Sequence, residues 1–185
     1  MSAVKKCPEL VSVGYNFDET KTVAMVLYDE AISEFGADVI QPVSCDEMFI
    51  DISKYVKNIE AKNMEDNRLG VLKTRLENLR KRIFEISNCS ASIGCGRSTT
   101  IARLATKKCK PDGLLIVENS EDFMETQKFS DLPGIGPNTM TKLLLENPEL
   151  SKNSTCFEVV SRRGCLEKVW LVCNRFFATL GTTKI

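Results

Sequence analysis

The sequence contains no histidine among its 185 residues, and this absence narrows the chemistry open to the chain. Without imidazole there is neither a serine–histidine triad nor a histidine general base, so catalysis would have to use carboxylates, lysines, hydroxyls or thiols. Long apolar runs are also missing, and none approaches the roughly 20 apolar residues that span a bilayer. Residues 1–6 lack the apolar core of a secretion signal. We therefore expect neither a membrane protein nor a secreted one.

Eight cysteines are present, but no two are spaced as a CxxC pair. Structural zinc sites gather cysteine and histidine ligands in such clusters, so no zinc site is expected. Without a secretion signal, reduced thiols in the nucleus or the cytosol are the expected state. The composition, 43% hydrophobic and 27% charged, is that of a folded globular protein rather than a disordered one.

The net charge is zero, but the charges are unevenly distributed along the chain. Residues 1–66 carry six Lys and Arg against thirteen Asp and Glu, whereas residues 67–113 carry eleven against three. Residues 114–185 carry eight against nine. An acidic segment beside a basic one suits a protein that holds metal ions in one place and phosphates in another, although surface charges also cluster by chance.

Hydrophobic periodicity predicts interleaved strands and helices up to about Val117, and helices after it. Strands are expected at 10–13, at 38–43 and 48–52 as a hairpin, at 89–94 and at 114–117. Helices are expected at 18–35 (capped by Asp18 and closed by Gly36), 69–86, 99–108 and 121–128, with an irregular polar stretch at 54–67. Pro42 cannot donate to a ladder and indicates an edge or a bulge near the hairpin tip. The order predicts an α+β fold, a ferredoxin-like sheet followed by a small helical domain.

Ser44-Cys45-Asp46-Glu47 occupies the predicted hairpin tip. Adjacent strand residues point to opposite faces, so neighbouring carboxylates converge only where a turn or a bulge redirects one of them. Carboxylate oxygens are ligands that Mg²⁺ favours, and two such ions can activate a hydroxyl and stabilise a departing pyrophosphate. On the Asp-Glu dipeptide alone, a solvated acidic turn is the simpler interpretation.

A glycine-containing turn and a basic helix follow. Gly94-Cys95-Gly96 leaves a predicted strand and enters a helix, where free backbone N–H groups are able to meet a phosphate. Five basic residues come next with no acidic residue among them: Arg97, Arg103, Lys107, Lys108 and Lys110. The combination indicates polyanion binding, although a basic helix face is usually only solvated.

Leu132-Pro133-Gly134-Ile135-Gly136-Pro137-Asn138-Thr139 lies between two helical stretches, with Lys142 one turn further on. We interpret it as the hairpin of a helix-hairpin-helix element. Its glycines let backbone N–H groups approach a DNA phosphate, and the second helix adds its positive N-terminus. Such contacts read no base and weaken with salt. The alternative interpretation is an ordinary Pro-Gly turn between helices.

Taken in this order, the three segments resemble the Y-family translesion DNA polymerases, from about Cys7 to about Phe177. The segment 43–47 resembles the S-x-D-E palm motif of that family, 92–96 through 110–113 its second palm signature, and 132–143 its thumb hairpin. The cysteine before Asp-Glu, with the segment 102–106, points to the deoxycytidyl-transferase branch. By resemblance the chain is a fragment, with part of the palm in residues 1–118 and the helical thumb in residues 119–185.

The resemblance also implies roles for individual residues. Asp46 and Glu47 would be the catalytic carboxylates and two of the three acidic ligands of Mg²⁺. Contacts with the incoming nucleotide, dCTP in this branch, would come from Lys110, Ser44 and Arg103. The residues that bind primer-template DNA would be Gly134, Ile135, Gly136, Asn138 and Lys142. A nuclear location follows from the same resemblance.

The sequence departs from the family pattern in three places. The strand with the third carboxylate and the fingers that hold the triphosphate have no counterpart, and the chain stops before a little-finger domain. Three interpretations stay open. The first is an enzyme that inserts nucleotides, dCMP by preference, opposite damaged bases. The second is a catalytically inactive palm–thumb fragment that only binds DNA, and the third is a ferredoxin-like domain with an unrelated role.

Overall fold

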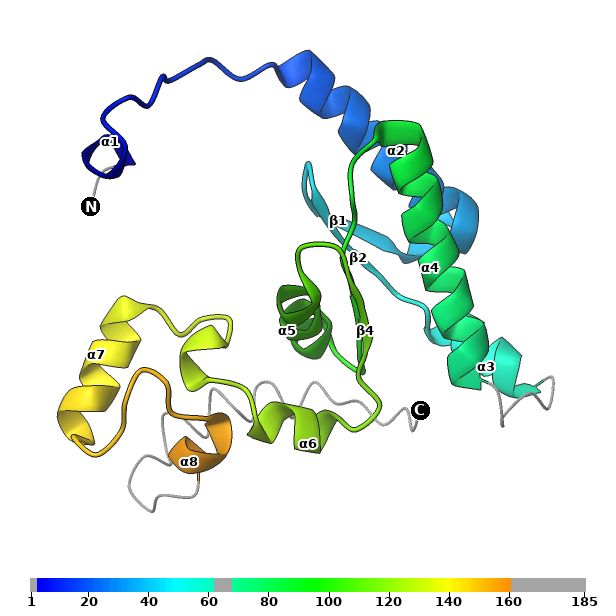
Figure 1. Cartoon of the computed structure of the whole chain (residues 1–185). Helices are drawn as coiled ribbons and strands as arrows, with labels where there is room; N and C mark the ends of the chain where they lie inside the picture. Colours follow the sequence, from blue (N-terminus) through cyan, green and yellow to red (C-terminus); the bar gives the residue numbers. More distant parts are fainter. Residues whose placement is uncertain (1–2, 62–67, 161–185) are drawn as a thin grey trace. The chain divides into compact units, whose positions relative to one another are not determined.

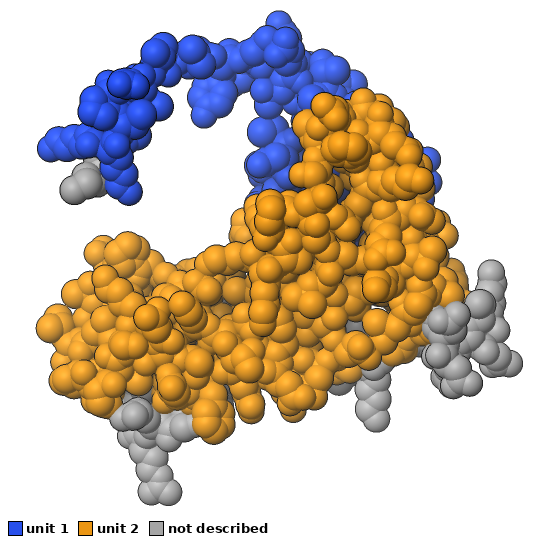
Figure 2. Space-filling model, in the orientation of Figure 1, with its two compact units in different colours: residues 1–50 blue, residues 51–185 orange. Residues whose placement is uncertain are grey.

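The computed structural model describes residues 3–61 and 68–160 (Figure 1). Part of the polar stretch predicted at 54–67 and the end of the predicted thumb, 161–185, lie outside the described residues. The chain divides into two compact units between Ile50 and Asp51 (Figure 2). Both units mix helices with short strands, which confirms the α+β class. The palm and thumb segments, 1–118 and 119–185, are a division by function and stay predictions.

Unit 1 is built on one long helix and a β-hairpin. The short helix α1 (Ala3–Lys6) precedes α2 (Phe17–Phe35), and a 3-10 turn, η1 (Ala37–Val39), leads to β1 (Ile40–Ser44) and β2 (Glu47–Ile50). The strands pair antiparallel, with Ile40 opposite Ile50 and Ser44 opposite Glu47. The predicted hairpin is confirmed, and a register shift between Pro42 and Ser44 is the bulge that the proline indicated.

Two other predictions for unit 1 are wrong. Residues 10–13 form no strand and are exposed, because a strand needs a neighbour for its backbone groups and no described strand pairs with them. The cap of α2 is Asn16, whose side chain accepts from Glu19 N at 3.3 Å. Asp18 lies inside the first turn, where it instead favours the positive end of the helix dipole. Gly36 does close the helix, with φ of 96°.

Unit 2 begins with α3 (Ser53–Ala61) and α4 (Arg68–Ser87). The irregular structure predicted from residue 54 onward is therefore wrong, since a short, mostly polar helix stands there. Hydrogen bonds from the Ser53 hydroxyl and N–H hold the pKa of Asp51 below its usual value, and the Ser53 N–H lies 2.9 Å from its carboxylate. α3 packs against α4. Of the six apolar residues that helical spacing predicts on one face of α4, Leu69 is half-buried, Ile86 is exposed, and the other four are buried: Leu72, Leu76, Leu79 and Ile83.

A βαβ crossover follows α4. β3 (Ile93–Cys95) and β4 (Leu114–Ile116) are parallel, and α5 (Thr99–Cys109) connects them and packs on both. β3 is shorter than the strand predicted at 89–94, whereas α5 and β4 agree with their predictions. The described residues thus form two separate two-stranded sheets, β1–β2 and β3–β4, where the sequence predicted one ferredoxin-like sheet. No described strand forms hydrogen bonds with strands of both sheets.

The rest of unit 2 is helical, as predicted: α6 (Ser120–Glu125), η3 (Phe129–Asp131), α7 (Pro137–Glu146) and α8 (Cys156–Val160). α6 ends at Glu125, three residues before the end of the helix predicted at 121–128. One buried cluster joins this part to α5: Ile101, Leu104 and Ala105 with Phe129, Leu132, Met140 and Val159. Within residues 3–61 and 68–160, no helix is long and apolar enough to cross a membrane.

Gly94 sets how closely α5 approaches β3. A Cβ at this position would collide with the backbone of Ala102 and Thr106, and the Gly94 N–H donates to Thr106 Oγ1 at 3.0 Å. Backbone atoms cannot yield as the end of a flexible side chain can. The crossover therefore requires glycine here.

We expect Gly94→Ala to lower the free energy of unfolding by about 1–3 kcal/mol, because the new methyl group overpacks the strand–helix contact. Gly70→Ala is the control, since Gly70 lies exposed within α4. It should raise the same quantity by about 0.5–1 kcal/mol through helix propensity. Urea denaturation followed by circular dichroism measures both, and a shift of the same sign for the two variants would contradict the packing argument.

Candidate active site and nucleic-acid interface

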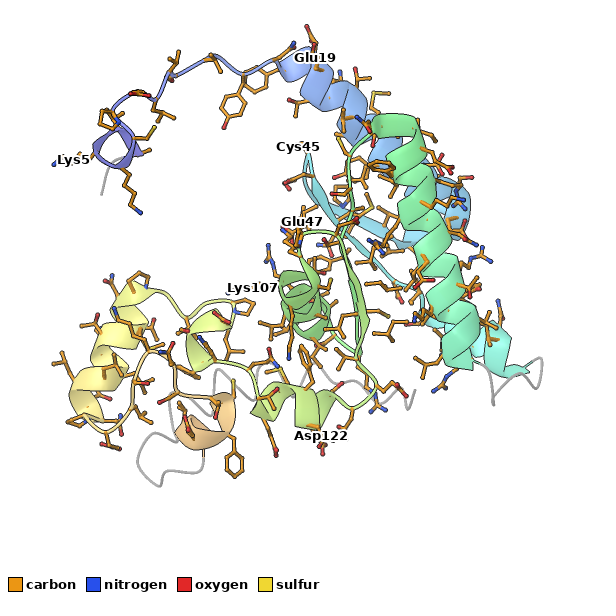
Figure 3. The ribbon with its side chains drawn as sticks, viewed as in Figure 1. Lys5, Glu19, Cys45, Glu47, Lys107 and Asp122 are labelled. Atoms are coloured by element: carbon orange, nitrogen blue, oxygen red, sulfur yellow. The ribbon has the colours of Figure 1, made fainter. Side chains whose placement is uncertain are left out.

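The hairpin tip of unit 1 presents the two neighbouring carboxylates. Cys45 and Asp46 form a two-residue turn between Ser44 and Glu47, and Figure 3 shows Cys45 at its end. Neither turn residue has a positive φ, because among the described non-glycine residues only Asn88 does. Tight two-residue hairpin turns usually need positive φ to match the twist of the strands. The adjacent bulge relieves that mismatch by increasing the local twist.

Ser44 orients the first carboxylate. Its hydroxyl donates to Asp46 Oδ1 at 2.5 Å, although both residues are exposed. Asp46 belongs to the turn, so it is released from the strand alternation that would separate it from the half-buried Glu47. Two neighbouring carboxylates converge only where a turn or a bulge redirects one of them, and this turn meets that condition.

Tyr28 of α2 contacts the same turn, a role that the sequence did not reveal. Its hydroxyl lies 2.6 Å from the Ser44 carbonyl oxygen and 3.4 Å from that of Glu47. Helical spacing places Tyr28 on the side of Ala24 and Ala31, as expected for an ordinary packing aromatic. The phenolic hydroxyl was the one available signal, since it needs a partner when half-buried.

The donor chemistry at the tip suits Mg²⁺, a hard cation that is commonly bound by one or two carboxylates together with waters and substrate phosphates. Asp46 and Glu47 are such a pair. In the described ranges, no three Asp, Glu, Cys or His side chains are grouped so as to hold a metal ion. The pair thus fits two positions of a magnesium site, and a third carboxylate is not found beside it among these residues.

The turn at 94–98 corrects one expectation. The sequence predicted free N–H groups there for a phosphate, but the Gly94 N–H is bonded to Thr106 and Ser98 caps α5 by accepting from Ile101 N at 3.3 Å. A Cβ at Gly96 would collide with the Ile101 side chain. These glycines serve the close packing of helix on strand, a use that the sequence pattern does not distinguish from a phosphate loop.

Lys107 and Lys108 of this basic segment are engaged within unit 2. Lys107 Nζ lies 2.7 Å from Asp131 Oδ1, and Lys108 Nζ lies 5.3 Å from the centre of the Phe123 ring. Figure 3 shows Lys107 on α5. Arg103 on α5 and Lys110, which directly follows the helix, are predicted nucleotide contacts, and both are exposed. Engaging Lys107 and Lys108 fixes α5 to the helical part of the unit.

The loop that follows Lys110 is held from α4. Arg80 Nε donates to the Ala91 carbonyl oxygen at 2.7 Å, and Arg80 Nη2 pairs with Asp112 Oδ1 at 2.5 Å. Ser92 Oγ donates to the Pro111 carbonyl oxygen at 2.7 Å. The segment that follows Lys110 is therefore held to α4 and to the residues that precede β3, even though the lysine itself is exposed.

The segment 132–139 is a tight turn that leads into α7. Ile135 N donates to the Leu132 carbonyl oxygen at 3.1 Å and Gly134 has φ of +88°, as in a type II turn with Pro133 at its second position. Pro137 opens α7, and Gly136 before it gives no side-chain cap. The element before the turn is the single 3-10 turn η3 and not a full helix. A Cβ at Gly134 or Gly136 would meet no atom within 4 Å.

Two further residues of the predicted DNA-binding set lie on α7. Asn138 and Lys142 are exposed and four residues apart, so they share one face of the helix. Because Gly136 supplies no acceptor, the first N–H groups of α7 have no side-chain cap, in contrast to those of α5. The turn, the helix start and this face are consequently continuous and open.

Residues 1–107 match the sequence model of the impB/mucB/samB family. The chain belongs to this family, the Y-family DNA polymerases. It is 36% identical over 143 residues to the DNA repair protein REV1 of Arabidopsis thaliana, a match that covers 76% of this chain and 12% of the relative. It is 31% identical over 144 residues to the DNA repair protein Rev1 of Drosophila melanogaster, covering 76% and 13%.

The fold agrees with that of a solved polymerase. The insertion ternary complex of Dbh DNA polymerase aligns with a TM-score of 0.66 at 20% identity, over 99% of this chain and 50% of the other. The Y-family chain thus spans half of that structure and about an eighth of the two curated relatives, 12% and 13% of their lengths.

Cysteine reactivity tests the site geometry. Burial raises the pKa of the Cys95 thiol to about 11, and burial also raises that of Cys109, whereas Cys7, Cys45 and Cys89 are exposed. Only the thiolate reacts, so at about pH 8 N-ethylmaleimide should modify the three exposed thiols at least about tenfold faster than Cys95. Mass mapping of a time course measures this. Equal rates for Cys45 and Cys95 in the folded protein would contradict the placement of β3.

Proposed function

We propose that this chain carries metal-binding and DNA-binding parts of a translesion polymerase. The enzyme would transfer dCMP by preference to a primer opposite damaged template bases. The observation that carries the proposal is the S-x-D-E hairpin, in which Ser44 orients Asp46 next to Glu47, within a chain that matches the family over residues 1–107. The two relatives are named as DNA repair proteins, which supports a repair role and a nuclear location.

Asp46 and Glu47 are the proposed ligands of Mg²⁺ and the catalytic carboxylates. The bound metal would supply positive charge that activates a primer hydroxyl and stabilises the departing pyrophosphate. Without it, the chain's own contribution is to hold the two carboxylates in one turn, where Ser44 fixes the direction of Asp46.

Lys110, Arg103 and Ser44 are the proposed contacts for the incoming dCTP. Arg103 on α5 and Lys110 just after it are exposed cations that suit a triphosphate, whose charge they would neutralise as pyrophosphate leaves. Ser44 already donates its one hydroxyl hydrogen to Asp46, so a nucleotide contact by this hydroxyl would require accepting a bond or exchanging partners. The preference for dCTP rests on the cysteine before Asp-Glu and on the likeness to two REV1 proteins.

The helix-hairpin-helix role of residues 132–142 is proposed on the open turn and the uncapped start of α7. Gly134, Ile135 and Gly136 would bring backbone N–H groups to the primer-template phosphates, and Asn138 and Lys142 would extend the contact along one helix face. A phosphate at this position would accept hydrogen bonds from the N-terminal N–H groups of α7, and the positive end of the helix dipole would stabilise its negative charge.

Gly136→Asp separates binding from stability, because an aspartate is a good N-cap but repels a phosphate. We expect DNA affinity to fall about tenfold, or ~1.4 kcal/mol, while the unfolding temperature is kept or raised. Gly14→Asp is the matched control, since Gly14 is also open, and it should leave affinity within about twofold of wild type. Fluorescence anisotropy on a primer-template duplex at two salt concentrations measures the affinity of both variants, and thermal unfolding followed by circular dichroism measures their stability. Equal losses for the two variants would point to general charge repulsion and against the hairpin.

A second candidate function, DNA binding without catalysis, is favoured by the grouping of just two carboxylates in the described residues. Primer extension with each of the four dNTPs separates the two functions. For the enzyme we expect dCMP incorporation that falls on the order of 100-fold or more in Asp46→Ala, because the metal loses a ligand. Asp29→Ala removes an exposed carboxylate of α2 and should have no such effect. Tight duplex binding with no incorporation of any nucleotide would support the non-catalytic function.

A further inference from the structure

Tyr28 holds the acidic turn from outside the hairpin. We propose that Tyr28 is a positioning residue of the metal site: its hydroxyl clamps the two ends of the turn from Ser44 to Glu47 and so fixes where Asp46 and Glu47 present their carboxylates. The inference rests on the proposed metal-binding function of those two side chains.

The contact geometry supports a clamp. Ser44 and Glu47 form the last pair of the β1–β2 ladder, and the Tyr28 hydroxyl lies 2.6 Å and 3.4 Å from their two carbonyl oxygens. One hydroxyl carries one hydrogen, so the shorter bond to Ser44 is the principal one and the longer approach to Glu47 is secondary. The phenol thus reaches both strands at the point where the turn leaves them.

The turn needs such an anchor because the hairpin alone specifies it weakly. Cys45 and Asp46 lack the positive φ of the tight turns that match strand twist. The register shift between Pro42 and Ser44 interrupts the ladder next to the turn, and Pro42 has no N–H to donate. β1 is also exposed from Gln41 to Ser44, so packing does not replace the missing ladder bonds.

Ser44 transmits the constraint to the first carboxylate. Its carbonyl oxygen accepts from Tyr28 and its hydroxyl donates to Asp46 Oδ1 at 2.5 Å, which makes a continuous path from α2 through Ser44 to Asp46. Groups that orient metal ligands in this way commonly change metal affinity when they are removed. Glu47 is constrained more directly, through its own backbone.

Tyr28→Phe in the full chain tests the clamp, with Mn²⁺ as the probe and free Mn²⁺ measured by electron paramagnetic resonance. We expect the affinity to fall about tenfold, the lower end of what such supporting groups contribute. Amide hydrogen exchange at Cys45 and Asp46, measured without metal, should become faster. Tyr15→Phe is the matched control because Tyr15 is 84% exposed in the same unit, and it should change neither quantity. Circular dichroism selects a temperature at which every variant is folded.

The outcomes are distinct. Unchanged exchange at the turn in Tyr28→Phe overturns the clamp. Faster exchange with wild-type Mn²⁺ affinity overturns the positioning role, because the tyrosine would then support the hairpin without affecting the site. Failure of the proposed metal site has its own signature: Asp46→Asn would bind Mn²⁺ as tightly as wild type, and the inference would fall with it.

Discussion

The close contact between β3 and α5 is the constraint on which the organisation of unit 2 depends. Gly94 removes the Cβ that would keep α5 away, and the Ala105 side chain is completely buried behind it. Leu104, also on α5, belongs to the same buried cluster as Phe129 and Met140. The helix that carries Arg103 and leads directly to Lys110, two of the proposed nucleotide contacts, is therefore also the core element that packs against the helical part bearing the proposed DNA-binding turn. A change in α5 packing would disturb both sites at once.

Charge is used differently in the two parts of the chain. Within the basic segment, Lys107 forms an ion pair with Asp131 that is partly exposed, and such pairs contribute little to stability, with a median of about 0–1 kcal/mol. Its value here is geometric, because it links α5 to η3 next to the hairpin turn. Among the described residues, no basic side chain forms an ion pair with Asp46 at the acidic tip, and its side-chain hydrogen bond comes from the neutral Ser44 hydroxyl. A neutral partner orients a carboxylate without neutralising it, which leaves its charge available to a cation.

Local patterns allowed the most successful predictions. The hairpin, its bulge at Pro42 and the apolar stripe of α4 follow from alternation, proline chemistry and helical spacing within a few residues. The strand expected at 10–13 failed because strand formation depends on a partner that local sequence cannot supply. The sequence did not predict α3 because, of residues 53–59, Val56 and Ile59 alone are buried. Glycines 94 and 96 were assigned to phosphate binding because tight packing and phosphate contact both select glycine. The position of Tyr28 on the helix favours packing, and local sequence does not reveal its hydrogen bond because Ser44 lies 16 residues further along the chain.

The uncapped start of α7 and the incomplete carboxylate pair lead to one further consequence. In the proposed roles a ligand would complete the bonding at both places: phosphate for the N–H groups after Gly136, and waters or phosphates for an ion on Asp46 and Glu47. An ion held by two protein carboxylates keeps most of its coordination positions open, so a nucleotide that fills them raises its affinity, and the ion raises that of the nucleotide equally. In the proposed roles, metal and nucleotide should occupy the tip together, whereas DNA binding at the hairpin would need neither. DNA binding is then the property least dependent on a complete metal site.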